Sequence, residues 1–194
     1  MAKSLEVERV AETHFMIRPM LRNALRNSLI TPEGQSVLSV SADNYLELWE
    51  GTYADRWFDM GTFVRLGTAI ETGLREFHGR LALSATPPGR GIFQRLVDPV
   101  ELEQLFRRDC GVEISSCRSW TEMREIMLHR HLFAHRSGLV DDQYIKNLAM
   151  LTGVDILPDV VASGYPVAGV YWFRPLSRLN EYIEHARRFF RDLP

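Results

Sequence analysis

The chain has 194 residues, of which 45% are hydrophobic and 25% are charged. These values are typical of one folded domain of ordinary size and exclude an intrinsically disordered chain. The formal net charge of −2 excludes a globally basic nucleic-acid-binding protein, although a local basic cleft stays open.

Segments that would direct export or span a membrane are absent from the sequence pattern. Residues 1–8 are charged where a signal peptide would be apolar. The apolar stretch 154–173 contains two prolines and two aspartates, so it is no transmembrane helix. Cys110 and Cys117 are too few for a disulfide framework. The sequence therefore predicts a cytoplasmic protein without membrane contact, whose two cysteines are reduced and buried.

Apolar residues at helical spacing predict three helices in the first part of the chain. The first covers residues 5–29, where Phe15 and Met20 belong to its apolar stripe, and a second begins near Ser41. A long third helix covers residues 56–82. Its glycines recur every six positions, which we expect either to admit a neighbouring helix or to kink the chain; they are Gly61, Gly67 and Gly73.

The second part of the chain predicts four more helices, after a loop at 85–91. Ser119 and Glu122 have the spacing of a capping box, which predicts that a helix begins there. Segment 154–175 reads as irregular, with a short strand at 167–173. The predicted helices run from Asp98 to Cys110, from Ser119 to Ser137-Gly138, over 141–151, and from a cap at Ser177 to about Leu193.

The predicted fold class is all-α (mainly α): a helical bundle with an irregular C-terminal excursion and a short β element. We expect one helical domain over 1–194, made of N-terminal helices (1–55), a core (56–153), and an irregular segment with a final helix (154–194). The tryptophans are candidates for base stacking or for the core, and we expect Trp57 and Trp120 in the core.

Residues 127–138 hold three histidines and two arginines near the end of one predicted helix. Imidazole exchanges protons near neutral pH, and guanidinium binds phosphate with a planar fork of donors. Arg130 and His135 together therefore suit cleavage of a phosphodiester.

Two other interpretations of this segment stay open. Cations at the end of a helix are often solvated partners of the helix dipole. His131 and His135 lie four positions apart, a spacing that can hold zinc, but no Glu follows His131 and no third ligand is near in sequence. We therefore expect no metal at this site.

The run Arg130-His131-Leu-Phe-Ala-His135 resembles the R-x4-6-H motif of the HEPN family, in its four-spacer form. Its continuation over 136–144 is similar to bacterial HEPN proteins in which the motif runs into a glycine, an acidic residue and a tyrosine. Residues 63–74, which include Glu71, resemble an earlier core helix of the family that carries a glutamate. The resemblance covers about residues 57–145, so the core segment is expected to be HEPN-like.

The resemblance implies an all-α bundle, commonly dimeric, that acts as a metal-independent endoribonuclease in toxin–antitoxin, abortive-infection or other defence systems. It implies no cofactor, RNA as the substrate, a homodimer, and an antitoxin or regulatory protein as a further partner. Arg130 and His135 become the catalytic pair, and His131 becomes a supporting polar residue. Glu71 becomes a weaker candidate that orients Arg130; the alternative role for Glu71 is a structural ion pair with a core arginine.

Helix geometry bears on how this pair would act. Positions five apart diverge by about 140°, so Arg130 and His135 do not point at one spot from a single straight helix. A dimer would give a shared cleft with two arginines and two histidines, in which one imidazole takes the proton of an RNA 2′-OH and another protonates the leaving 5′-oxygen. Two alternatives remain: a non-catalytic HEPN module that binds a nucleotide, RNA or a partner protein, and a plain helical interaction protein with a fortuitous motif.

Overall fold

The computed structural model describes residues 4–28, 53–82, 90–162 and 170–194. Over these ranges the fold is all-α, which confirms the predicted class. The α-helices are α1 (Leu5–Ser28), α3 (Tyr53–Leu81), α4 (Val100–Cys110), α5 (Trp120–Arg136), α6 (Asp142–Thr152), α7 (Leu157–Ala162) and α8 (Leu179–Asp192). Short 3-10 helices are η1 (Arg90–Gln94), η2 (Ile114–Ser116) and η4 (Arg174–Arg178). The helix expected near Ser41 lies outside the described residues, as does most of the loop at 85–91.

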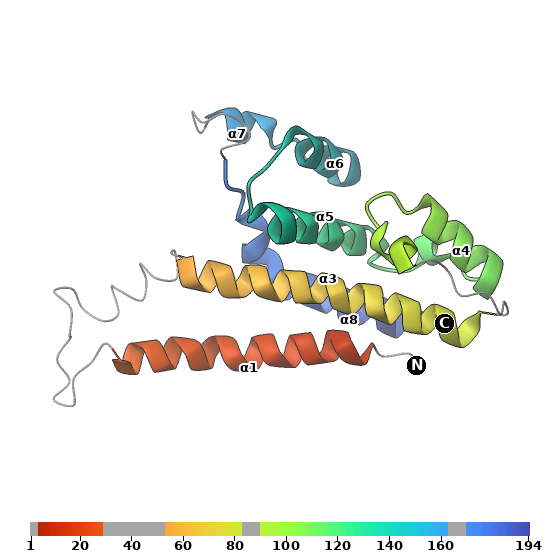
Figure 1. Cartoon of the computed structure of the whole chain (residues 1–194), viewed down its shortest axis with the longest axis horizontal. Coiled ribbons are helices and arrows are strands. Elements are labelled where there is room, and N and C mark those ends of the chain that lie inside the picture. The colour runs from red at the N-terminus through yellow and green to blue at the C-terminus, as the bar shows by residue number, and fades with distance from the viewer. Residues whose placement is uncertain (1–3, 29–52, 83–89, 163–169) are drawn as a thin grey trace.

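Among the described elements, α1, α3, α5 and α8 form a bundle, and α3 is its central member (Figure 1). α3 packs on α1, α5 and α8, and it runs antiparallel to α1 and α5. α6 packs on the other side of α5, and α7 follows it, while α4 lies near the C-terminal end of α3 (Figure 1). In the parts of the chain that are described, no helix is long and apolar enough to cross a membrane.

The core forms where apolar faces of these helices meet. On α8, Leu179, Ile183, Ala186 and Phe190 recur at intervals of three or four residues and are all buried, which is the spacing of a face that packs on neighbouring helices. Phe63 of α3 lies at the centre of an aromatic cluster, with ring centroids 5.3 Å from those of Phe133 on α5 and Tyr182 on α8. One contiguous core therefore joins elements from all three predicted segments of the chain.

Of the three glycines singled out in the sequence, Gly67 and Gly73 do admit neighbours; Gly79, also in α3, continues the same spacing and, among the described residues, has nothing within 4 Å of a would-be Cβ. A Cβ atom added at Gly67 would lie 2.7 Å from Cγ of Arg130 on α5, and one at Gly73 would lie 2.7 Å from the ring of Phe190 on α8. Gly61 has nothing within 4 Å of its would-be Cβ. The close approach of α5 and α8 to α3 offsets the poor helix propensity of the first two glycines.

The capping box predicted at Ser119 is wrong, although α5 begins where expected. Ser119 has a left-handed backbone (φ 68°) and its side chain makes no cap hydrogen bond. Its hydroxyl instead lies 3.1 Å from Nδ1 of His185, and a Glu122 carboxylate oxygen lies 3.7 Å from the same nitrogen. Ser119 and Glu122 therefore both contact His185 on α8 instead of capping α5. Ser177 also fails to cap α8: its hydroxyl donates to the carbonyl of Arg174 within η4.

Several side chains expected in the core are exposed. On α1, Val7 and Val10 face the bundle, whereas Phe15 and Met20 of the predicted apolar stripe are exposed, because α1 contacts the bundle along one narrow face. Trp57 is 57% exposed, so its predicted core position is wrong, while Trp120 is buried as expected. Cys110 and Cys117 are free and half-buried, and burial raises the pKa of both thiols.

The described parts of segment 154–175, residues 154–162 and 170–175, contain more regular structure than predicted, namely α7 and the start of η4. The expected strand at 167–173 is reduced, within the described residues, to one antiparallel bridge between Leu139 and Tyr171. Backbone hydrogen bonds from Val140 to Val170 (3.0 Å) and from Trp172 to Gly138 (2.9 Å) hold this bridge. It fixes residues 170–173 against the chain that leaves α5.

Candidate functional site

The candidate residues Arg130, His131 and His135 all lie on the C-terminal half of α5, but they face two different neighbours. Arg130 faces α3, where Gly67 has no side chain and the arginine stem packs directly on the helix. The two histidines face the opposite neighbour, α6, where they line a cavity. The divergence follows from the helical repeat, because Arg130 and His135 are five positions apart.

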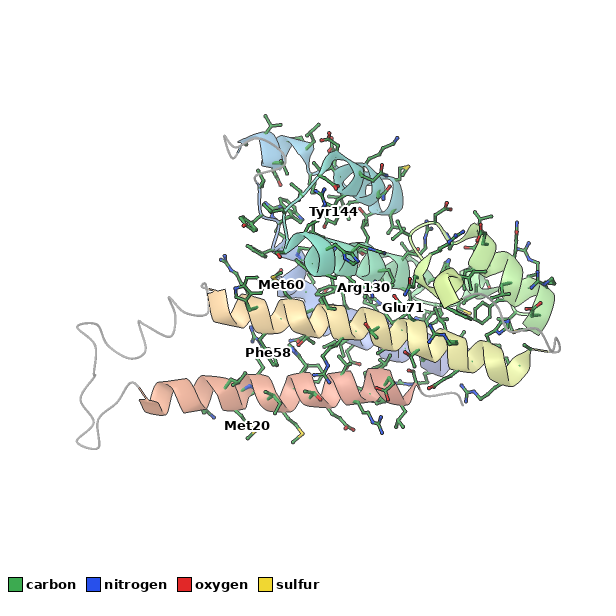
Figure 2. The ribbon with its side chains drawn as sticks, viewed as in Figure 1. Met20, Phe58, Met60, Glu71, Arg130 and Tyr144 are labelled. Carbon is green, nitrogen blue, oxygen red and sulfur yellow. The ribbon has the colours of Figure 1, made fainter. Side chains whose placement is uncertain are left out.

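Arg130 is held in an ion pair with Glu71 of α3 (Figure 2). Nη1 of Arg130 lies 3.3 Å from Oε1 of Glu71, and the two side chains are only 15% and 7% exposed. Gln94 of η1 donates to the other carboxylate oxygen at 3.4 Å. Within the described residues, Nε of Arg130 and Oε1 of Glu71 have no hydrogen-bond partner. The contact fits both roles considered for Glu71, that of orienting Arg130 and that of a structural pair.

His131 and His135 stand side by side, one helical turn apart, with ring centroids 5.5 Å apart. They line a cavity of about 350 Å³ between α5 and α6, with an apolar floor that includes Leu128 and Leu132. The polar lining of the cavity is completed by Arg136, Asp141, Gln143, Tyr144 and Asn147. A hollow with an apolar floor and a few polar side chains is the usual form of a small-ligand site.

Burial lowers the pKa of His131, and the nearby charges of Arg130 and His135 lower it further. His131 is therefore neutral at pH 7, with one ring nitrogen free to accept a proton. A neutral imidazole that lines a cavity has the protonation state required of a general base.

Asp141, which also lines this cavity, links the start of α6 to the end of α5. Its carboxylate caps α6 by accepting a hydrogen bond from the backbone amide of Tyr144 at 2.6 Å. The same carboxylate pairs with Nη1 of Arg136 at 3.0 Å. The N-terminus of α6 thus anchors a guanidinium beside the two histidines, a role the sequence pattern did not assign to Arg136.

Arg130 and His135 are not brought together in one chain. Arg130 is absent from the lining of the histidine cavity, and no described contact joins it to His135. Among the described residues, no three His, Cys, Asp or Glu side chains are grouped so that they could hold a metal ion.

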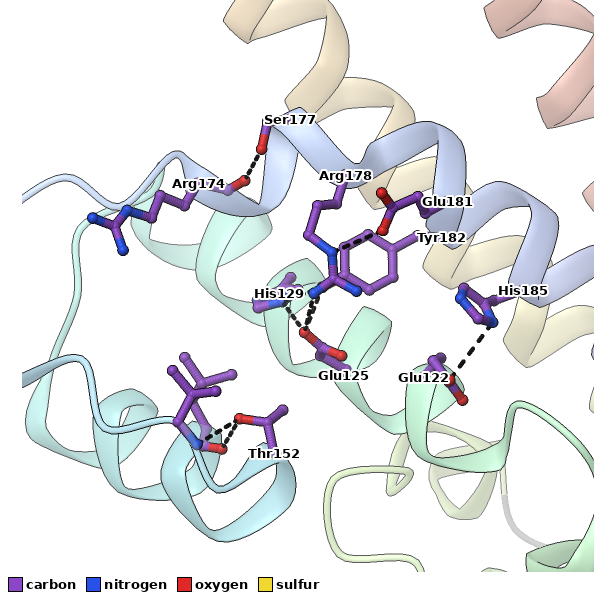
Figure 3. A network of polar contacts seen from close by, with 12 residues as sticks. Glu122, Glu125, His129, Thr152, Arg174, Ser177, Arg178, Glu181, Tyr182 and His185 are labelled. Atoms are coloured by element: carbon purple, nitrogen blue, oxygen red, sulfur yellow. Dashed lines mark hydrogen bonds and ion pairs between the residues drawn. The ribbon is translucent and has the colours of Figure 1, made fainter.

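A second polar cluster, which the sequence analysis missed, surrounds His129 (Figure 3). His129 Nε2 lies 3.4 Å from Oε1 of Glu125, and His129 Nδ1 lies 2.9 Å from the hydroxyl of Tyr144. Tyr182 of α8 donates to Glu125, and Nη1 of Arg178 lies 3.5 Å from that carboxylate. The i, i+4 spacing of Glu125 and His129 was the only signal in the sequence.

These contacts fix the protonation states of the cluster. Burial lowers the pKa of His129, so the ring is neutral. Burial acts to raise the pKa of Glu125, but hydrogen bonds from His129 and Tyr182 and the charge of Arg178 outweigh it, so the pKa is lowered. Nε2–H of His129 then donates to the Glu125 carboxylate, and Nδ1 accepts from Tyr144. His129, the histidine of segment 127–138 that lies outside the motif, is therefore a satisfied core residue.

Comparison of the chain with protein-family models, curated proteins and solved structures gave no match.

Proposed function

We propose that this chain is a metal-independent endoribonuclease of the HEPN type that serves as a toxin or defence effector. The observation that carries the proposal is the paired imidazoles of His131 and His135 on the wall of a cavity that also holds a guanidinium, Arg136. The resemblance of the Arg130–His135 segment to the family motif supplies the reaction class. An antitoxin or regulatory protein would be the partner that controls it.

The proposed chemistry divides proton transfer between the two rings. His131, neutral at pH 7, accepts the proton of the RNA 2′-OH, which then attacks the adjacent phosphorus. His135 in its protonated form donates a proton to the leaving 5′-oxygen. The products are a 2′,3′-cyclic phosphate and a 5′-hydroxyl. Arginine donors stabilise the charge that develops on the phosphate oxygens.

A homodimer would complete the site with Arg130. In one chain this guanidinium faces Glu71 and α3, away from the histidine cavity. A second copy packed against the C-terminal half of α5 would set Arg130 of one copy opposite the histidines of the other.

The test is an RNA-cleavage assay in EDTA that compares wild type with His135→Ala and Arg130→Ala. We expect each variant to lose about 100-fold or more in rate, the effect of removing a general acid or an electrostatic stabiliser. Arg191→Ala, which removes an exposed arginine of α8, is the matched control and should cleave normally. Full activity in both site variants, or a strict metal requirement, would rule out the proposal.

The alternative is a non-catalytic HEPN module that binds a nucleotide, RNA or a partner protein. One observation favours it: Arg130 is engaged by Glu71 and does not line the cavity. This alternative predicts no cleavage by wild type and loss of binding in the same variants. Measuring binding and cleavage on the same preparations separates the two functions.

A further inference from the structure

A cluster of outward-facing aromatic side chains lies at the end of α5, next to the histidine cavity. The bridge between Leu139 and Tyr171 holds the chain around Tyr171 extended, and side chains of an extended segment point alternately to opposite sides. Val170 and Trp172 are accordingly buried in the core. Tyr171 therefore lies on the other side and is 55% exposed, whereas Phe173, where the backbone turns into η4, is half-buried and packs against the core.

The rings of Tyr171 and Phe173 are stacked. The centroids of Tyr171 and Phe173 are 5.6 Å apart and their planes differ by only 14°. Phe173 fits against the chain because Gly138 has φ 92° and no side chain; a Cβ at Gly138 would lie 2.8 Å from the ring. The guanidinium of Arg56, on α3, lies over the Phe173 ring at 5.0 Å. The stack is thus held by backbone and neighbours while one of its rings stays open.

These residues line a cavity of about 530 Å³. The exposed Trp57 and the buried Met60 of α3 form one wall, and Ser137 closes the cavity at the end of α5. Among the described residues that line it there is a guanidinium and no carboxylate. A cavity of this size, built from flat rings and one cation, has the chemistry of a site for a planar base carried on an anionic chain.

The position of this cavity ties it to the candidate site. Ser137 lines it, while the preceding residue, Arg136, lines the cavity of His131 and His135. Consecutive Cα atoms are about 3.8 Å apart, so the two cavities flank the same end of α5. A nucleotide strand that crosses this helix end would reach both.

We propose that Trp57 and Tyr171 form a stacking platform for the unpaired bases of single-stranded RNA, that Phe173 supports the Tyr171 ring from behind, and that Arg56 binds the adjacent phosphate. This assignment rests on the proposed function, because it makes single-stranded RNA the substrate class of the histidine cavity. Bases in a duplex are already stacked on one another and are not available to aromatic side chains, whereas unpaired bases stack on them regardless of sequence. An interface with another protein is the competing use of the same surface.

The experiment measures binding without cleavage, using a short, fluorescein-labelled, single-stranded RNA whose 2′-hydroxyls are methylated. We expect Tyr171→Ala to weaken binding roughly 5- to 150-fold, the range for loss of one base–aromatic stack, and Tyr171→Phe to restore it. Phe15→Ala, which removes an exposed aromatic ring from α1, is the control and should bind as wild type. An unlabelled duplex should compete poorly.

Salt dependence separates the two roles within the platform. Arg56→Gln should lower the slope of log affinity against log salt by about 0.7, since one phosphate contact is lost. Tyr171→Ala should leave that slope unchanged, because stacking releases no counterion. Equal slopes in all variants would refute the assignment of Arg56.

Unchanged RNA affinity in Tyr171→Ala overturns the platform. If, in addition, Tyr171→Ala changes the oligomeric mass measured by sedimentation, this surface is a protein interface and not an RNA-binding platform. Cleavage of unmodified RNA is scored separately: cleavage with no effect of Tyr171→Ala refutes the platform alone, and Tyr171-dependent binding without cleavage refutes the nuclease alone.

Discussion

The identity of the candidate site residues could be predicted from the sequence, whereas the neighbours of each side chain depend on how the helices pack. The sequence was enough to select Arg130, His131 and His135 as candidates, because it shows their side-chain chemistry and spacing. The sequence was not enough to predict which residues surround them. Which face meets Gly67 and which meets α6 depends on how three helices pack. Arg136 and the His129 cluster were missed for the same reason: their partners lie on other elements.

The buried His129 makes stability depend on pH. Its pKa in the folded chain lies below the 6.5 of a free histidine because of burial. As the pH falls below 6.5, the unfolded chain therefore binds a proton before the folded chain does, and the free energy of unfolding decreases. Above that pH both states are neutral, and this contribution to stability is fully present.

We expect urea titrations at pH 7.5, 6.5 and 5.5 to show this loss, with a slope of up to about 1.4 kcal/mol per pH unit from His129 alone. His129→Gln should be less stable at pH 7.5 by about 1–3 kcal/mol, since buried hydrogen bonds are broken. It should also lose less stability than wild type on acidification. A variant with the same pH slope as wild type would contradict the assignment to His129.

Among the secondary-structure elements, the periodic apolar pattern predicted the long helices correctly. The local capping signals were less reliable as predictors of how each helix begins. α4 and α6 begin and end close to the predicted positions. The serine caps failed, because Ser119 found a partner on α8 and Ser177 falls within η4. A capping box is a local signal, and a tertiary hydrogen bond of similar strength can displace it.

The glycines of α3 offer a matched pair of substitutions. Gly67→Ala places a methyl group 2.7 Å from Cγ of Arg130, so the arginine must move away from Glu71. Gly61→Ala meets nothing within 4 Å. We expect Gly61→Ala to stabilise the fold by about 1 kcal/mol through helix propensity. Gly67→Ala should lose that gain to the clash and should also lower RNA cleavage, if Arg130 acts in it.

Thermal unfolding and the EDTA cleavage assay, run on both alanine variants, check this expectation. Equal stabilisation by the two substitutions would mean that α3 and α5 are farther apart than the structure has them. A normal cleavage rate in a destabilised Gly67→Ala chain would separate the position of Arg130 from catalysis.

At the scale of the whole molecule, the all-α class follows from composition and periodicity, but the order in which helices pack does not. The glycines of α3 indicated that a neighbouring helix could pack closely on it, but nothing in the sequence identified its neighbours as α1, α5 and α8. The proposed dimer belongs to this scale too, since Arg130 and the histidines face different sides of one chain.

Subunit mixing tests the shared cleft. If each site takes Arg130 from one copy and His135 from the other, Arg130→Ala and His135→Ala chains are both inactive alone. Unfolded together and refolded, half of their dimers are mixed and each mixed dimer has one intact site of two, so about one quarter of wild-type activity should return. No recovery, with dimers formed, would place the complete site within one chain.

The contact between Glu8 on α1 and Arg187 on α8 joins positions 179 residues apart in the chain. Closing so long a loop is entropically costly, and pairings of this range are slow to form. α1 contacts the bundle through α3 and α8, and its detachment would leave α3, α5 and α8 in contact. We therefore expect α1 to dock late and to detach before the other helices. Local detachment of α1 would expose an N-terminal segment to proteases before the rest of the protein unfolds. The rate of degradation would then depend on the stability of this one helix.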